Sequence, residues 1–253
     1  MKRWGDLLAA AAGIIALSPI LFPVGLVIWL QDFQSPFYVA SRTGRGGRPF
    51  RMVKFRSMVV RADRTGVDST SGDDPRITHI GRFVRRFKLD EFPQLWNVLR
   101  GEMSLVGPRP NVERETGLYT REERQLLSVR PGITDLASIV FSDEGDILRG
   151  SEDPDIKYNQ VIRPWKSRLS LLYVRNAGSP WLDLQVIWLT ARSAVDRPGA
   201  LRAVSRLVRK LGGDEQLARI AERSDPLPVA PPPGATEIVQ SRVPAARLGG
   251  SAP

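Results

Sequence analysis

The sequence predicts a mixed α+β protein that is mostly helical. We expect an N-terminal re-entrant membrane helix, amphipathic interfacial helices and a small cytosolic body with a β-hairpin. Three observations support this prediction. Residues 7–30 are apolar and uncharged, two strand-like runs flank a turn-forming loop, and several segments begin with a helix-capping residue followed by proline.

The composition limits the chemistry that the chain can perform. Its 253 residues are 42% hydrophobic, as in globular proteins, and 37 basic against 27 acidic residues give a net charge of +10. This excess predicts an anionic partner: a phosphorylated ligand, an acidic lipid surface or a nucleic acid. The absence of Cys and the single His exclude thiol nucleophiles, disulfides, and metal sites built on cysteine or on several histidines.

The apolar segment 7–30 is long enough to span a membrane, but its sequence favours a bend. A straight helix of this length would reach about 36 Å, beyond the roughly 30 Å of bilayer hydrocarbon. Pro19, at the centre, cannot donate a backbone hydrogen bond to the carbonyl of Ile15, whereas the Ser18 hydroxyl can bond to a preceding carbonyl and favour a kink. Each resulting arm is about half as long as the hydrocarbon is thick.

Basic residues flank both ends of this segment. Lys2 and Arg3 precede it, and residues 31–66 contain eight basic residues against two acidic ones. The positive-inside rule then places both ends in the cytoplasm. A helix that breaks at Ser18-Pro19 and leaves by the face it entered satisfies both observations, and a straight span is the alternative.

The other elements follow from periodicity and capping signals. Asp90 is expected to cap a short amphipathic helix that has Pro93 in its first turn. Ser179 and Pro180 open a later helix in the same way. The predicted elements are a hairpin at 37–40 and 50–55 and helices at 81–88, 90–99 and 181–195.

The sequence from Pro198 onward predicts a basic helix followed by a disordered tail. The helix that begins at Pro198 has an apolar stripe backed by four cations, which fits an interfacial helix on a membrane and equally a helix packed on the body. Residues 224–253 contain seven prolines and no aromatic residue, which predicts a disordered tail. Trp165, Trp181 and Trp188 fit either the membrane interface or the core. The stripe is Leu201, Val204, Leu207, Val208 and Leu211, and the cations are Arg202, Arg206, Arg209 and Lys210.

Two neighbouring carboxylates are a candidate for catalysis. Asp90 and Glu91 follow Arg85, Arg86 and Lys88, and a helix start keeps carboxylates ionised. An ionised Asp90 can attack phosphorus and form an acyl phosphate. Glu91 can help to hold Mg²⁺, which prefers oxygen ligands and substrate phosphates. Taken alone, the pair also fits an ordinary helix N-cap.

Two arginines lie in backbone that proline stiffens. Arg109 stands between Pro108 and Pro110, and Arg130 precedes Pro131. A fixed guanidinium can bind a phosphate through two parallel hydrogen bonds. Each segment by itself also fits a rigid turn with a solvated arginine.

Five segments in order carry a family resemblance. Over about residues 1–195 the chain resembles the bacterial sugar transferase family, which comprises monotopic polyprenyl-phosphate phosphoglycosyltransferases. The Ser18-Pro19 pair matches the break in that family's re-entrant helix. The five segments are KFRSM at 54–58, DPRIT at 74–78, LDEFPQLWNVLRG at 89–101, SLVGPRP at 104–110 and VRPGIT at 129–134.

The resemblance implies a reaction at the cytoplasmic face of the bacterial inner membrane. A nucleoside-diphosphate sugar, usually UDP-linked, gives its sugar-1-phosphate to polyprenyl (undecaprenyl) phosphate, UMP leaves, and polysaccharide or glycoconjugate assembly begins. The resemblance implies Asp90 as the nucleophile that forms a covalent phosphosugar, and Glu91 as its Mg²⁺-associated partner. The expected substrate-binding residues are Arg85, Arg109, Lys54, Arg56 and Arg130.

On this basis we expect four regions in the chain. They are a re-entrant membrane helix (1–31), a catalytic phosphoglycosyltransferase domain (32–195), a basic amphipathic helical segment (196–223) and a disordered proline-rich tail (224–253).

We also expect membrane lipids as further partners. A homodimer is compatible with the sequence, and no nucleic acid is expected as a partner.

The resemblance is incomplete after Thr134. Many members of the family continue with a pattern that contains Asn-Gly-Arg, whereas residues 135–146 read DLASIVFSDEGD. A basic contribution to the pocket is therefore missing or comes from other cations, for which Arg149, Lys157, Arg163 and Lys166 are candidates. The intact acidic pair favours an enzyme over two alternatives, an inert membrane-attached scaffold and a nucleic-acid-binding protein.

Overall fold

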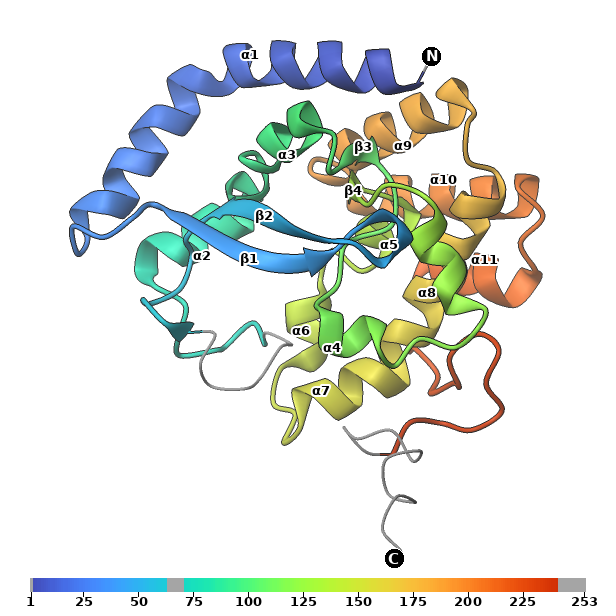
Figure 1. Ribbon diagram of the computed structural model, residues 1–253. Coiled ribbons are helices and arrows are strands. Elements are labelled where there is room, and N and C mark those ends of the chain that lie inside the picture. The colour runs from blue at the N-terminus through green and yellow to red at the C-terminus, as the bar shows by residue number, and fades with distance from the viewer. Residues whose placement is uncertain (1, 63–70, 241–253) are drawn as a thin grey trace, which may run out of the picture.

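The structure is a computed structural model that describes residues 2–62 and 71–240. It is a mostly helical α+β arrangement with two small sheets (Figure 1). The strands are β1 (Phe37–Thr43), β2 (Pro49–Phe55), β3 (Ser104–Val106) and β4 (Gly132–Thr134). The helices are α1 (Lys2–Leu30), α2 (His79–Arg86), α3 (Gln94–Arg100), α4 (Glu113–Thr116), α5 (Leu136–Val140), α6 (Glu144–Leu148), α7 (Pro154–Lys157), α8 (Arg163–Arg175), α9 (Pro180–Ser193), α10 (Arg197–Lys210) and α11 (Glu215–Glu222).

Helix α1 is continuous but bent, and its two halves run in different directions over the body (Figure 1). The Ser18 hydroxyl donates to the carbonyl of Ile15 over 2.8 Å. Pro19 has no backbone N–H and cannot donate to this carbonyl, so the Ser18 hydroxyl takes its place as the sequence predicts. In the described part of the chain, α1 is the one helix that is long and apolar enough to cross a membrane.

Both halves of α1 pack on the body along one side. Ala10, with Ile14 and Leu17, joins a cluster under the N-terminal half, and Ile28 is buried in a separate cluster under the C-terminal half. The other side is open, and Phe22 remains 76% exposed. The helix therefore presents a continuous apolar surface outward while its inner side is part of two hydrophobic clusters.

The first residues of α1 are fixed by polar contacts as well. Lys2 Nζ lies 2.7 Å from Asp183 Oδ2, and Arg3 donates to the carbonyl of Val98 over 2.7 Å. Asp6 is buried and accepts a hydrogen bond from the Ser104 hydroxyl over 2.8 Å. Charges that the sequence suggests as topology signals thus also hold the helix on α3, β3 and α9.

The predicted hairpin is present and somewhat longer than expected. β1 and β2 pair antiparallel, with Phe37 opposite Phe55. The parallel pair β3–β4 was not predicted from the sequence. Gly107 and Gly132 lie close together at this pair of strands. A Cβ on Gly107 would lie 2.5 Å from the carbonyl oxygen of Arg130, and a Cβ on Gly132 would collide with the backbone nitrogen of Gly107, so both positions require glycine. This contact brings the Arg109 and Arg130 loops together.

The prediction that Ser179 caps a helix is confirmed, since its side chain accepts from the Leu182 N–H at the start of α9. Thr78 caps α2 through Gly81, which was not predicted. The prediction that Asp90 caps a helix over 90–99 is wrong. The acidic pair lies in a separate 3-10 turn, η3 (Leu89–Glu91), and α3 begins after Pro93, whose ring leaves no backbone N–H to continue the turn.

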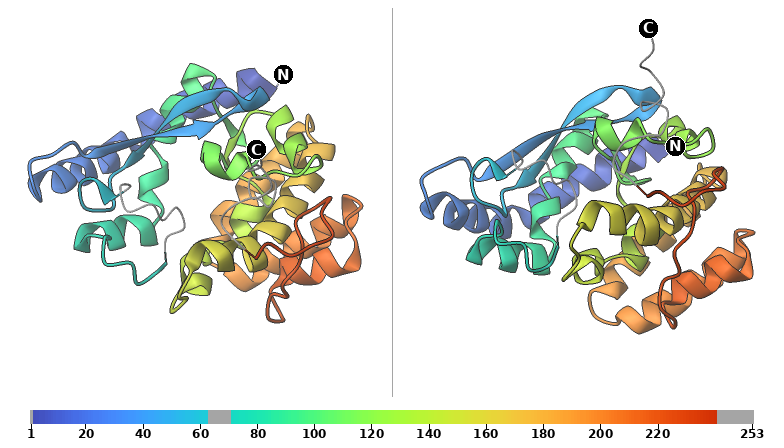
Figure 2. Two further views of the ribbon diagram at one scale, coloured as in Figure 1. Left: turned by 60° about the horizontal axis from the view of Figure 1, so that its bottom comes forward. Right: turned by 90° about the horizontal axis from the view of Figure 1, so that it is seen from below.

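The helix predicted to begin at Pro198 packs its apolar stripe on the body, which agrees with the second of its two interpretations and corrects the expectation of an interfacial helix. Its apolar stripe faces α5, α8, α9 and α11, and Val204 and Val208 are fully buried. In Figures 1 and 2, α10 and α11 lie at the opposite end of the molecule from the C-terminal half of α1.

The three tryptophans differ in exposure. Trp181 and Trp188 on α9 are 66% and 57% exposed, whereas Trp165 is buried.

Residues 224–240 follow a defined path, which corrects the expectation of disorder for this part of the tail. Trp165 Nε1 donates to the carbonyl of Pro228 over 2.8 Å, and Arg168 donates to the carbonyl of Pro231 over 3.0 Å. A proline-rich segment lacks N–H donors but keeps its carbonyls, and side chains of α8 bind these acceptors. The remaining tail, 241–253, lies outside the described residues.

Candidate active site

The turn η3 positions the acidic pair, Asp90 and Glu91, beneath α1. Lys88 adopts a left-handed conformation (φ 53°) that ends α2 and redirects the chain. On either side of the pair, Leu89 packs in the cluster under the C-terminal half of α1, and Phe92 packs in the cluster under the N-terminal half. The position of the two carboxylates is therefore coupled to both halves of the bent helix.

Glu91 is engaged by two cations from other elements. Arg109 Nη2 lies 2.7 Å from Glu91 Oε1, and Lys54 Nζ, on β2, lies 3.8 Å from the same oxygen. Burial alone would raise the pKa of Glu91, but Arg109, Lys54 and Lys88 outweigh it and hold the pKa at about 2. Glu91 is therefore a fixed anion.

Asp90 has the opposite electrostatic environment. Burial, together with the neighbouring charge of Glu91, raises the pKa of Asp90, although Lys54, Arg109 and Arg85 act against the shift. No residue in the described ranges forms an ion pair with Asp90. Two adjacent carboxylates with oppositely shifted pKa values are typical of a site in which one performs chemistry and the other supports it.

Arg85 lies in the last turn of α2, and its charge acts on Asp90. Its Nη1 atom is buried and has no hydrogen-bond partner within the residues that the structure describes. Burial lowers the pKa of Arg85, and the charges of Asp90 and Asp74 partly compensate. A buried guanidinium nitrogen without an acceptor is uncommon, and it is suited to an anionic ligand.

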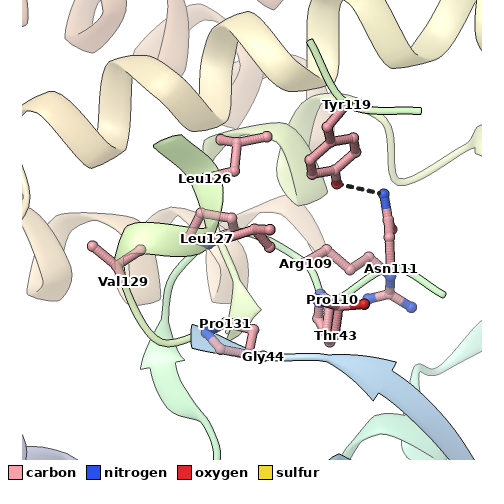
Figure 3. A pocket seen from close by; sticks show the side chains of 11 residues that line it. Thr43, Gly44, Arg109, Pro110, Asn111, Tyr119, Leu126, Leu127, Val129 and Pro131 are labelled. Atoms are coloured by element: carbon pink, nitrogen blue, oxygen red, sulfur yellow. Dashed lines mark hydrogen bonds between the residues drawn. The ribbon is translucent and has the colours of Figure 1, made fainter. Parts of the chain in front are cut away.

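Arg109 is held by the loop that follows β3. Behind its backbone lies a small hollow, lined among others by Thr43, Tyr119 and Leu126, with room for no more than about one water molecule (Figure 3). Asn111 Nδ2 donates to the Tyr119 hydroxyl there over 3.0 Å. Glu91, which the Arg109 guanidinium contacts, is not among the residues that line this hollow.

A family model described as bacterial sugar transferase matches residues 1–197, which is more than half of the chain. The chain belongs to the bacterial sugar transferase family.

The chain is also similar in sequence to several named proteins. Over 206 residues, or 77% of the chain and 36% of the relative, it is 39% identical to an undecaprenyl-phosphate glucose phosphotransferase of Komagataeibacter xylinus. Over 203 residues, or 79% of the chain and 45% of the relative, it is 32% identical to a UDP-N-acetylgalactosamine-undecaprenyl-phosphate N-acetylgalactosaminephosphotransferase of Aeromonas hydrophila. Over 153 residues, or 54% of the chain and 68% of the relative, it is 40% identical to the exopolysaccharide production protein ExoY of Sinorhizobium fredii. The chain spans less than half the length of the first two relatives.

Two of the expected substrate-binding residues of this sugar transferase have structural partners elsewhere. Arg56 forms a bidentate ion pair with Asp32 (2.5 and 2.6 Å) and closes the connection between α1 and β1. Arg130 donates to the carbonyl of Gly101 over 3.0 Å, at the C-terminal end of α3. The structure brings Lys54, Arg85 and Arg109 to the acidic pair but does not bring Arg56 or Arg130 to it.

Lys88 and Glu144 were not among the predicted site residues, whereas Lys166 was one of the four candidate cations. Lys88 lies two residues before Asp90, and its pKa is lowered by burial and by Arg109, against the opposing charges of Glu91 and Asp90. Glu144 on α6 and Lys166 on α8 form an ion pair of 2.6 Å. Lys88 is visible in the basic run before Asp90, whereas nothing local in the sequence points to Glu144. Arg163, another candidate cation, is buried against Glu123.

The residues of the sugar transferase fit Mg²⁺ only as a cation shared with substrate. The described residues contain no group of three or more His, Cys, Asp or Glu side chains that could hold a metal by themselves. Mg²⁺ is usually held by one or two carboxylates plus substrate phosphates, and Asp90 and Glu91 supply such a pair. Glu91, with its low pKa, is the residue that would hold the ion, which when bound would neutralise phosphate charge.

The lowered pKa of Lys54 predicts that substrate binding depends on pH. Burial and Arg109 lower its pKa to about 8, against the opposing effects of Glu91 and Asp90. A lysine loses its charge as pH rises through its pKa, so we expect the KM for the phosphate-bearing substrate to rise above about pH 8. The Lys54→Arg variant remains charged and should shift this rise to higher pH. Steady-state KM between pH 6.5 and 9.5 tests this, and identical profiles for the two proteins would contradict it.

Proposed function

We propose that the chain transfers a sugar-1-phosphate from a nucleoside-diphosphate sugar, with UDP as the nucleotide, to polyprenyl (undecaprenyl) phosphate. The single observation that carries the proposal is the difference in electrostatic environment between Asp90 and Glu91. Glu91 is engaged by Arg109 and Lys54, whereas Asp90 has a raised pKa and no ion-pair partner in the described chain. The family and the names of its members support the same reaction class.

In the first step Asp90 acts as the nucleophile. A carboxylate oxygen attacks the phosphorus that bears the sugar, an aspartyl–phosphorus bond forms, the bond to the bridging oxygen breaks, and UMP leaves with that oxygen. The raised pKa favours this role, because a carboxylate that is poorly stabilised by its surroundings is a better nucleophile.

In the second step the phosphate oxygen of the polyprenyl phosphate attacks the same phosphorus. The aspartyl–phosphorus bond breaks, Asp90 is restored and a polyprenyl-diphosphate sugar forms. Arg85 and Arg109, together with Lys54, surround the reacting phosphate with positive charge. Phosphoryl transfer depends chiefly on such positioning and charge neutralisation.

A panel of nucleotide sugars tests the function directly. The purified chain is incubated with polyprenyl phosphate, Mg²⁺ and one UDP-, GDP- or dTDP-linked sugar at a time, and release of the nucleoside monophosphate is measured together with the lipid product. We expect UMP and a polyprenyl-diphosphate sugar from at least one UDP-sugar. No release from any donor would favour the alternative, an inert membrane-attached scaffold for polysaccharide assembly.

We further propose that α1 is re-entrant and that the protein is monotopic at the cytoplasmic face of the inner membrane. The bend at Ser18-Pro19 supports this, and so does the packing of both halves of α1 on one body. A straight span would separate one half from its cluster. The exposed Trp181 and Trp188 on α9, next to the N-terminal half through the Lys2–Asp183 pair, suit a membrane interface.

The topology can be measured with single cysteines because the chain has none. One cysteine is added before Met1, and another is introduced as Arg48→Cys in the exposed hairpin loop. We expect a membrane-impermeant maleimide to label neither site in intact spheroplasts and both after permeabilisation. Replacement of Ser18 and Pro19 by leucine should straighten α1 and expose the N-terminal cysteine. Labelling of that cysteine in intact spheroplasts of the parent protein would contradict the re-entrant model.

A further inference from the structure

A hollow of about 180 Å³ lies between the start of α9 and the end of α10. It is much larger than the hollow behind Arg109, which has a volume of about 10 Å³. Leu182 and Leu207, which line it, are buried, whereas Trp181 lines it and is 66% exposed. Neither residue of the acidic pair lines this hollow, so it is separate from the candidate active site. Apolar walls beside an exposed indole suit an amphipathic ligand.

The polar side chains that line the hollow offer hydrogen-bond donors and no carboxylate. Lys210 contributes an ammonium group, Gln185 an amide and Trp181 an indole N–H. Among the described residues, none of these three side chains has a hydrogen-bond or ion-pair partner. Since neither Asp nor Glu occurs among its described lining residues, the hollow carries a positive charge. This set of groups fits the phosphate of an anionic ligand.

Two contacts hold the walls of the hollow in place. Asn176, at the end of α8, donates to the carbonyl of Leu172 over 2.9 Å and to that of Leu211 over 3.4 Å. Ser179 caps α9 by accepting from the Leu182 N–H over 3.3 Å. These contacts join the ends of α8, α9 and α10, so the hollow is formed before a ligand arrives.

Helix α9 lies between the N-terminal end of α1 and α10 (Figure 1). One side of α9 binds α1 through the ion pair of Asp183 with Lys2, and another side lines the hollow through Gln185. Between these sides, Leu184 and Trp188 are 58% and 57% exposed. The exposed apolar face of α9 therefore connects the apolar helix α1 with the hollow.

We propose that this hollow binds an anionic phospholipid of the surrounding membrane. Lys210 binds the phosphate of the headgroup, and Leu207 and Leu211 pack against the first methylenes of an acyl chain. A free phosphate would leave the apolar part of the lining unused. The inference rests on the membrane attachment of α1 that is proposed above, and it does not depend on the proposed reaction. Since Lys210 lies beyond the residues 1–197 that the family model matches, the site needs the C-terminal extension of this chain.

The lipids retained by the full-length protein measure this site. The protein is released from detergent micelles that contain phosphatidylglycerol or phosphatidylcholine, and the dissociation constants of the bound lipids are determined by native mass spectrometry. Lys210→Met removes the ammonium group, and Lys210→Arg keeps the charge. Arg206→Met removes a charge one turn earlier on α10, outside the hollow, as the matched control. Gln185→Phe keeps the charge and fills the hollow, and Tm is recorded for every variant.

We expect the parent protein to bind one phosphatidylglycerol more tightly than any phosphatidylcholine. Lys210→Met should weaken that binding by about tenfold, as for the loss of a charged hydrogen bond. Gln185→Phe should weaken it by occupying the space, whereas Lys210→Arg and Arg206→Met should bind like the parent. UMP release should be equal in the parent and in Lys210→Met, because the hollow is separate from the acidic pair.

Three results would contradict the inference. If phosphatidylcholine binds as tightly as phosphatidylglycerol, or if Lys210→Met keeps the parent affinity, the hollow is not a site for an anionic lipid. If inorganic phosphate displaces the lipid at equal concentration, the hollow binds a free anion. If farnesyl phosphate displaces it far more readily, the hollow belongs to the polyprenyl substrate. Absence of UMP release from the parent protein would refute the proposed reaction and leave the lipid site standing.

Discussion

The Asp90→Asn variant is expected to lose all measurable turnover while it keeps its fold. The substitution preserves the size of the side chain and removes the oxygen anion that forms the bond to phosphorus. It also removes a buried charge that is repelled by Glu91, so stability should not fall. UMP release in the presence of a nucleotide sugar and polyprenyl phosphate is the measurement, with circular dichroism to confirm folding.

A covalent intermediate gives a second measurement of the same variant. With a nucleotide sugar labelled in the phosphate next to the sugar, and no lipid acceptor, label should remain on the parent protein after denaturation and be absent from Asp90→Asn. Asp196→Asn makes the same chemical change at the exposed start of α10 and should retain both activity and label. Label on Asp90→Asn at the parent level would exclude Asp90 as the attacking residue.

Replacement of Arg109 by lysine is expected to impair catalysis although the charge is kept. Arg109 binds Glu91 through Nη2 over 2.7 Å, and its planar guanidinium has further N–H groups with which to bind a phosphate. An ammonium cannot make both sets of contacts at once. We expect kcat/KM to fall by about 1–3 kcal/mol in transition-state stabilisation, the usual scale for a hydrogen bond to a charged group.

The matched control for Arg109 is an arginine in an ion pair of similar length on the surface. Arg175 lies 2.8 Å from Glu122 and its side chain is 58% exposed. Arg175→Lys should leave kcat/KM unchanged, because exposed ion pairs contribute little and neither partner contributes to the pKa shifts of Asp90 and Glu91. Equal kcat/KM for Arg109→Lys and the parent enzyme would reduce Arg109 to a structural residue of its loop.

Much of the local structure could be read from the sequence. The hairpin, the capping of α9 by Ser179 and the hydroxyl bond of Ser18 to Ile15 agree with expectation. Each depends on residues within a few positions of one another, where periodicity, capping and the missing N–H of proline decide the outcome. The acidic turn is the exception, since Lys88 adopts a left-handed conformation that nothing in the sequence indicates.

The membership of the site was predicted only in part. Lys54 and Arg109 contact Glu91, and the charge of Arg85 acts on Asp90, in agreement with the positions that the resemblance implies. Arg56 and Arg130 also lie in the motifs and carry the same charge, yet they bind Asp32 and the carbonyl of Gly101. A motif records which residues occur together, and it does not distinguish an arginine that binds a ligand from one that holds a turn.

By itself the sequence determined the family, the nucleophile candidate Asp90 and the hydroxyl bond of Ser18 inside the N-terminal apolar helix. Only the tertiary structure decided that the apolar face of α10 packs in the core and that Arg56 binds Asp32 instead of the acidic pair. The physical reason is the range of the interactions. A cap or a kink is fixed by neighbours in the chain, whereas the partner of an amphipathic face or of a cation is chosen by packing between distant segments, as when Lys2 binds Asp183.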